Sequence, residues 1–254
     1  MECKLAKALS KTTDLKQSGE QPSRAKCCVV AAASQAKTPT TLRYVLNESA
    51  HVHSVSGELV IKRVSVPDLD QRFSDMAETF NKQHEHYETM VRHIKNVRQI
   101  YGCNNNNSLG LAECVKKIRE EHEAHYRVSL KLIGYDFSLS VVPLGSAGDN
   151  TEEPLPPHLK LAQGEFKDAS DSAKATISKG TTIQELTGWL IRSTDQMAKQ
   201  VTGATANYQE QRRLTDNLEK NIKEVKRARD LSQRYRQRAT EVLSEVAEIA
   251  KTFQ

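Results

Sequence analysis

The stretch LDQRFSDMAETFNKQHEHYETMVRHIKNVRQIY, residues 69–101, contains the most regular pattern in this sequence. Its apolar side chains recur alternately four and three residues apart, so they fall on one stripe of an α-helix. The stripe consists of Leu69, Phe73, Met76, Phe80, Tyr87, Met90, Ile94, Val97 and Tyr101, with the polar Gln83 among them. This spacing predicts a long helix with a heptad seam that packs against another helix.

The residues around this stretch indicate where the helix begins and ends. Ser65 is a candidate N-cap, Pro67 suits the first turn, and Gly102 can take the left-handed conformation that ends a helix. A short Asn-rich connector follows, and a less regular apolar spacing predicts a second helix over residues 108–133. Because short connectors favour antiparallel neighbours, we predict a helical hairpin over residues 67–142.

The residues before this module show no helical period. Residues 1–40 are rich in Ser, Thr, Gln and Lys, which predicts a disordered N-terminal arm. Residues 41–66 contain short β-branched runs and predict a small β-hairpin. An isolated hairpin is marginal in water, so it needs a further strand, and the alternating run 135–141 is the candidate.

The chain after the hairpin module divides into a linker and a long helix. Residues 143–180 are rich in Pro, Gly, Ser and Asp, which predicts a flexible linker. Residues 181–254 predict one long C-terminal coiled-coil helix, opened by a capping box at Thr182 and Glu185 and weakened by glycine at Gly203. Its predicted seam includes Leu190, Met197, Val201, Tyr208, Leu218, Ile222, Val225, Val242, Val246 and Ile249. The expected fold class is therefore mainly α, with long helices and coiled-coil seams.

The composition bears on the class of function. Aromatic residues make up 5% of the 254 residues and the mean hydropathy is −0.62, which argues against a large compact core with a walled pocket. The sequence contains no nucleophile elbow and no Gly-rich phosphate cradle. We therefore expect a protein that is not an enzyme and that has no cofactor and no small-molecule substrate.

Histidine and cysteine give little support for a metal site. His122 and His125, three residues apart, are the best pair for sharing an ion, but they lie on a polar helix face. The five cysteines are odd in number, include an adjacent pair and lack Cys-x-x-Cys spacing, which indicates a reducing compartment. We expect a cytoplasmic, cytoskeleton-associated protein, with mitochondrial import as an alternative.

Basic side chains gather near the C-terminal end of the sequence. Arg213, Lys220 and Arg227 are seven residues apart and fall opposite the predicted seam. The basic face that we predict comprises Arg213, Lys220, Lys223, Arg227, Arg234 and Arg238. Such a face is usually solvated, but clustered Lys and Arg also attract acidic proteins, nucleic acid and anionic membranes. Tyr235 is the one aromatic residue in this run, so base stacking is not indicated.

These patterns favour a non-enzymatic coiled-coil scaffold or adaptor subunit that mediates protein–protein assembly. Its helix seams would bind protein partners, through self-association or through a partner helix. The alternative hypothesis is an electrostatic module that holds nucleic acid or an anionic membrane through the basic C-terminal helix.

Overall fold

The computed structural model of the protein describes residues 57–103, 110–144 and 154–252. The elements are α1 (Pro67–Ile100), α2 (Leu111–His122), β1 (Tyr126–Ile133), β2 (Asp136–Pro143), α3 (Pro157–Arg192), α4 (Thr194–Gly203) and α5 (Tyr208–Thr252). This order confirms a mainly helical chain, and it adds a small two-stranded antiparallel sheet. The predicted arm, residues 1–40, lies outside the described residues.

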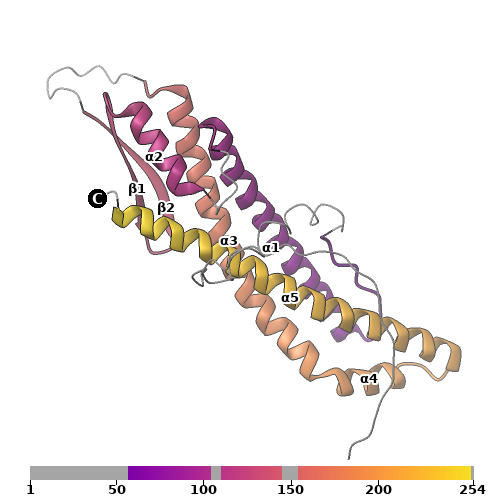
Figure 1. Cartoon of the computed structure of the whole chain (residues 1–254). Helices are drawn as coiled ribbons and strands as arrows, with labels where there is room; N and C mark the ends of the chain where they lie inside the picture. Colours follow the sequence, from indigo (N-terminus) through magenta and orange to yellow (C-terminus); the bar gives the residue numbers. More distant parts are fainter. Residues whose placement is uncertain (1–56, 104–109, 145–153, 253–254) are drawn as a thin grey trace, which may run out of the picture. The chain divides into compact units, whose positions relative to one another are not determined.

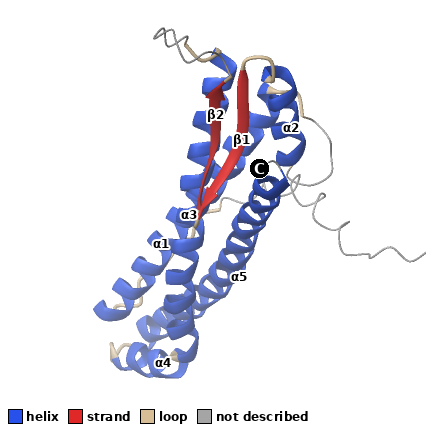
Figure 2. Ribbon diagram, turned by 90° about the vertical axis from the view of Figure 1, so that its left-hand side faces the viewer, coloured by secondary structure: helices blue, strands red, loops and turns tan. Residues whose placement is uncertain are grey.

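The three long helices α1, α3 and α5 lie side by side, as Figures 1 and 2 show. The C-terminal halves of α1 and α5 share one apolar cluster with the N-terminal half of α3, α2 and both strands. The opposite halves of the three helices share a second cluster with α4. Helix α3 therefore runs antiparallel to both α1 and α5.

The predicted stripe of α1 is its buried face. Every predicted seam residue from Leu69 to Tyr101 is buried, except Tyr87, which is half-buried, and Gln83 is buried among them. Because α3 and α5 cover this face, the apolar period is satisfied within one chain. Coiled-coil packing in the strict heptad sense stays a prediction.

The ends of α1 agree with the sequence only in part. Pro67 lies in the first turn, and Gly102 has a left-handed φ of 60°, as expected. The prediction for Ser65 is wrong, because Val66 takes the N-cap position with no side-chain cap. Ser65 instead has a φ of 59°, which is uncommon for a residue other than glycine.

The predicted helix over residues 108–133 is wrong in its second half, and the helical hairpin is not confirmed. Helix α2 ends at His122, and β1 follows and pairs antiparallel with β2. The apolar side chains of Val128 and Leu130 are two residues apart and both are buried, which is the period of a strand. Gly134, with a φ of 64°, lies in the tight turn between the strands.

Strand β2 contains most of the alternating run 135–141, so the expectation of a strand there is confirmed. Its partner is β1, and residues 57–66, the described part of the segment 41–66, form no strand. Helix α3 covers the other edge of β2, where the Phe137 N–H donates to Ser170 Oγ at 2.8 Å and Gln163 Nε2 donates to the Leu139 carbonyl at 3.1 Å.

The linker prediction for residues 143–180 is wrong from Pro157 onward, because α3 begins there. Its buried face consists largely of small side chains, among them Ala162, Ala169 and Ala173. Small residues let α3 approach its neighbours closely, but they resemble a linker in composition. Thr182 and Glu185 lie inside α3, so they do not form the predicted capping box.

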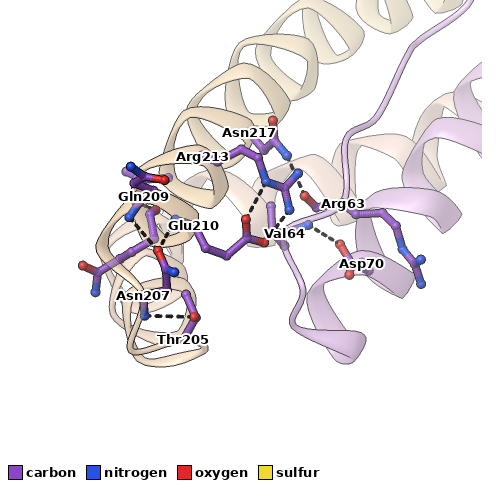
Figure 3. A network of polar contacts seen from close by, with 11 residues as sticks. Arg63, Val64, Asp70, Thr205, Asn207, Gln209, Glu210, Arg213 and Asn217 are labelled. Carbon is purple, nitrogen blue, oxygen red and sulfur yellow. Dashed lines mark hydrogen bonds and ion pairs between the residues drawn. The ribbon is translucent and has the colours of Figure 1, made fainter.

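The C-terminal helix is broken where one continuous helix was predicted over residues 181–254. Helix α3 ends at Arg192, the short α4 ends at Gly203, and α5 starts at Tyr208. Asn207 caps α5, because its Oδ1 accepts hydrogen bonds from the N–H groups of Gln209 at 2.9 Å and Glu210 at 3.2 Å (Figure 3). This break lets α5 return along α3.

Residues 57–66, which we call the strap, precede α1 as an extended segment without strand pairing. The strap is the described part of the predicted β-hairpin region 41–66, so no hairpin is present in that part. It contacts α1 and α5 through hydrogen bonds to Asn81 and Asn221.

Candidate interaction surfaces

The predicted seam of the C-terminal region is largely covered by the same chain. Its buried members are Leu190, Met197, Val201, Leu218, Ile222, Val225, Val242, Val246 and Ile249. Tyr208 is the exception: it is 74% exposed, since it lies where the chain turns into α5. The structure thus places the seam residues of α1, α3, α4 and α5 in two shared clusters. They form the core of the chain and are not an open surface for a partner helix.

The predicted basic face lies on the side of α5 away from these clusters, but half of it is paired. Arg213 donates to Glu210 at 2.8 Å from Nε, and Arg227 donates to Glu224 at 2.8 Å. Arg238 donates to Glu241 at 2.9 Å. Each partner is three residues away on the same helix, so these pairs are local and each contributes little to stability.

The other half of the predicted face is free of such pairing. Lys220, Lys223 and Arg234 are exposed, and no ion pair within the described ranges involves them. Lys226, which belongs to the same basic run but not to the predicted face, is exposed as well. These four cations lie on one side of α5.

The same side of α5 also contains acidic residues. Asp216, Glu219 and Asp230 are exposed among the lysines and arginines. A continuous polyanion would meet these carboxylates as well as the cations, whereas a protein surface can place a base opposite each acid. The charge pattern of this side is therefore mixed, with an excess of positive charge.

A polar and aromatic layer separates the two apolar clusters at the middle of the long helices. Gln83 is fully buried, and its Nε2 donates to the carbonyls of Thr176 at 3.0 Å and Ser232 at 3.4 Å. Next to it, the rings of Tyr87 and Tyr235 stack with their centroids 4.3 Å apart. Burial raises the pKa of Tyr235 to about 12, and the neighbouring Tyr87 adds to this effect. Tyr235, the one aromatic residue in the basic run, is thus buried and cannot stack on a base.

Trp189 packs at the surface of the second apolar cluster rather than standing free. The guanidinium carbon of Arg72 lies 4.2 Å from the centroid of the Trp189 ring, a cation–π contact between α1 and α3. This contact joins two helices of the core, so it is structural.

The histidines and cysteines of the described ranges form no metal site. No group of three or more His, Cys, Asp or Glu side chains suited to a metal occurs there, and Cys3, Cys27 and Cys28 lie outside those ranges. Cys103 and Cys114 are buried, and burial, followed by the nearby Cys103 thiol, raises the pKa of Cys114. A buried thiol of high pKa reacts slowly, so Cys114 lacks the character of a nucleophile.

No protein-family model, no curated protein and no solved structure shows significant similarity to this chain. In the described part of the chain, no helix combines the length and the apolar character that crossing a membrane requires.

Proposed function

We propose that this protein is a non-enzymatic adaptor subunit that binds an acidic protein partner through the outward side of α5. The observation that supports the proposal is the exposed trio Lys220, Lys223 and Arg234, which has no carboxylate partner in the described ranges, although three other basic residues of α5 each have one.

The three long helices suit such a role because they supply a supported platform. Val225 and Ala228 anchor α5 in the core, and both are fully buried. A charged surface on a helix that is held by packing loses little conformational freedom when a partner binds. The carboxylates of Asp216, Glu219 and Asp230 favour a protein partner over a nucleic acid or an anionic membrane, which remains the alternative function.

The test compares two full-length charge-reversal variants. The first carries Lys220→Glu, Lys223→Glu and Arg234→Glu on α5. The control carries Lys131→Glu, Lys160→Glu and Lys167→Glu, which are exposed positions on β1 and α3. The two variants have the same net charge, so a difference between them reports the position of the charges and not their sum.

Three probes distinguish the kinds of partner: an acidic polypeptide that also contains bases, such as a glutamate–lysine copolymer with glutamate in excess, a DNA duplex, and phosphatidylcholine vesicles with 20–30 mol% phosphatidylserine, roughly as in anionic leaflets. We expect the acidic polypeptide to bind the wild type and the control but not the α5 variant, and to be released as salt rises. Equal binding to both variants contradicts the proposal. Loss of duplex or vesicle binding alone would favour the alternative function.

A further inference from the structure

The strap, residues 57–66, is hydrogen-bonded to both α1 and α5, and we call the surface of these two helices that it covers the groove (the helices are labelled in Figure 1). Leu59 and Val64 are buried in the second apolar cluster, while Val60 is 70% exposed. Lys62 and Arg63 face solvent as well. The strap therefore buries some of its apolar side chains and exposes its other side chains to solvent, as an extended peptide does in a binding groove.

Side chains of the two helices hold the main chain of the strap. Asn221 forms a two-fold contact with Lys62: its Oδ1 accepts from the Lys62 N–H at 2.9 Å, and its Nδ2 donates to the Lys62 carbonyl at 2.7 Å. Asn217 Nδ2 donates to the Arg63 carbonyl at 2.8 Å (Figure 3). Asn81 Oδ1 accepts from the Leu59 N–H at 3.1 Å. These bonds depend on an extended backbone and not on which copy of the chain supplies it.

The strap reaches the groove only by a sharp reversal at Ser65. Its first residue, Gly57, lies against His84 in the middle of α1, and the Val64 N–H donates to Asp70 in the first turn at 2.7 Å (Figure 3). The strap thus runs antiparallel to the helix that follows it. The left-handed φ of 59° at Ser65 belongs to this reversal, and such a conformation is costly for a residue with a side chain.

We propose that the strap is exchanged between two copies of the protein, so that residues 57–64 of each copy, which precede the hinge at Ser65, occupy the α1–α5 groove of the other. A strap from a second copy makes the same contacts in the groove as the chain's own strap. Opening the reversal lets Ser65 adopt an ordinary negative φ, so exchange relieves strain at two hinges for each dimer. This inference is independent of the outward side of α5, because the strap and its Asn contacts do not include Lys220, Lys223 or Arg234.

A first experiment asks whether the groove accepts a strap in trans. A full-length chain with Leu59→Asp and Val64→Asp has an unseated strap and an unaltered groove. We expect a fluorescent peptide of residues 57–66, GELVIKRVSV, to bind this chain at least about tenfold more tightly than the wild type, in which the chain's own strap competes. Adding Asn221→Ala should weaken this binding about tenfold, because two hydrogen bonds are lost. A peptide with aspartate at both apolar positions is the control.

A second experiment uses the hinge in otherwise unaltered chains. Ser65→Gly accepts a positive φ without strain, whereas Ser65→Val resists it. We expect the dimer association constant, measured by light scattering over a concentration series, to fall for Ser65→Gly and to rise for Ser65→Val. The change should be about fivefold or more for each of the two hinges. Mixing two differently labelled wild-type samples should also yield mixed dimers.

The two experiments together decide the proposal. Absence of peptide binding to the unseated chain, with the hinge variants equally monomeric, means that the strap is a permanent part of the core and overturns it. Peptide binding without any difference in association between the hinge variants also overturns it, since the strap then stays in the groove of its own chain. Tighter association of Ser65→Val than of Ser65→Gly, together with peptide binding, supports exchange.

Discussion

Gln83 is the polar residue in the apolar stripe of α1, and the structure explains its position. Its amide nitrogen reaches carbonyls of both α3 and α5, so it contacts all three long helices at one level. Its Oε1, however, is buried and has no hydrogen-bond partner. A buried polar atom without a partner is costly, so the net contribution of Gln83 to stability is small.

We expect Gln83→Met to leave the free energy of unfolding within about 1 kcal/mol of the wild type or to raise it, because methionine fills a similar volume and removes the unpaired oxygen. By contrast, Phe80→Ala, one turn away, should lower it by about 3–5 kcal/mol. Urea unfolding of both variants checks the pair. A loss for Gln83→Met as large as that for Phe80→Ala would show that the amide is essential to the fold.

Glu245 is a carboxylate of α5 that caps another helix. Its Oε1 accepts hydrogen bonds from the N–H groups of Leu111 at 3.0 Å and Ala112 at 3.3 Å, at the start of α2. Burial nevertheless raises the pKa of Glu245 above its ordinary value of 4.5, because it outweighs these two bonds. The folded protein therefore holds this proton at a pH at which the unfolded chain has released it.

It follows that Glu245 favours the folded state most below pH 4.5, and that this contribution is lost as pH rises through the raised pKa. Glu245→Gln keeps an acceptor for Leu111 and carries no charge. We expect the variant to gain stability relative to the wild type as pH rises from 4.5 toward neutral, and to match it at lower pH. Thermal unfolding across this range measures the difference, and a gap that shrinks with rising pH contradicts the assigned direction.

Among single residues, the buried stripe of α1 and the roles of Pro67 and Gly102 could be predicted, because each depends on local geometry. The contacts of Asn81, Asn217 and Asn221 could not, because the bonds of Asn221 to the strap join residues 159 apart in the sequence. Nothing in the spacing of asparagines indicates which backbone they will meet.

Helix α3 shows where composition misleads. Its first half contains Ser, Asp, Lys and Gly, yet Ala162, Ala169 and Ala173 form a buried face against the neighbouring elements. Alanine has the best intrinsic helix propensity, and a narrow face of alanines permits close approach between helices. Polar composition alone therefore gave the wrong prediction, and the spacing of the small residues was the available signal.

We expect Ala173→Leu to lower the free energy of unfolding by about 1–3 kcal/mol. Ala173 is fully buried, so a larger side chain at this position would be overpacked against the neighbouring elements. Lys174→Leu, at the next position, is the matched control because that side chain is 54% exposed. Circular dichroism during urea unfolding would separate the two variants. A similar effect of both would show that the close approach of α3 is not important for stability.

The turn between α4 and α5 is the element boundary that heptad spacing missed. The heptad rows continue in the sequence across residues 204–211, where Ala204 and Tyr208 are exposed. The residues of the turn interrupt the heptad period here: Gly203 ends α4, and Asn207 caps α5.

We therefore expect Asn207→Ala to lower the free energy of unfolding by about 1 kcal/mol. The comparison is with Asn207→Asp, which retains a capping oxygen.

The whole chain buries its own seams, and this changes how a seam mutation should behave. Leu218 is buried in the second apolar cluster, among side chains of the same chain. We expect Leu218→Ala to lower the free energy of unfolding by about 2–5 kcal/mol. At concentrations at which the protein is monomeric, this loss should not depend on protein concentration. Concentration-dependent unfolding of the variant in that range would point to a partner helix instead.

The long helices were predictable because their apolar periods extend over many turns. Their arrangement was not, since a heptad stripe is equally suited to a neighbour in the same chain or in another one. Strand β1 was missed because it follows α2 after only three residues, Glu123 to His125, which leaves little room for a turn signal in the sequence.

The position of the strap has a consequence for the order of events during synthesis. The strap precedes its partner Asn221 by 159 residues in the sequence. A ribosome that adds about 5–20 residues per second needs roughly 8–30 s to cover that interval. Throughout that time the strap has been made and its groove has not. On a polysome, where nascent copies of the same chain lie close together, the first completed groove that a strap meets can therefore belong to a neighbour.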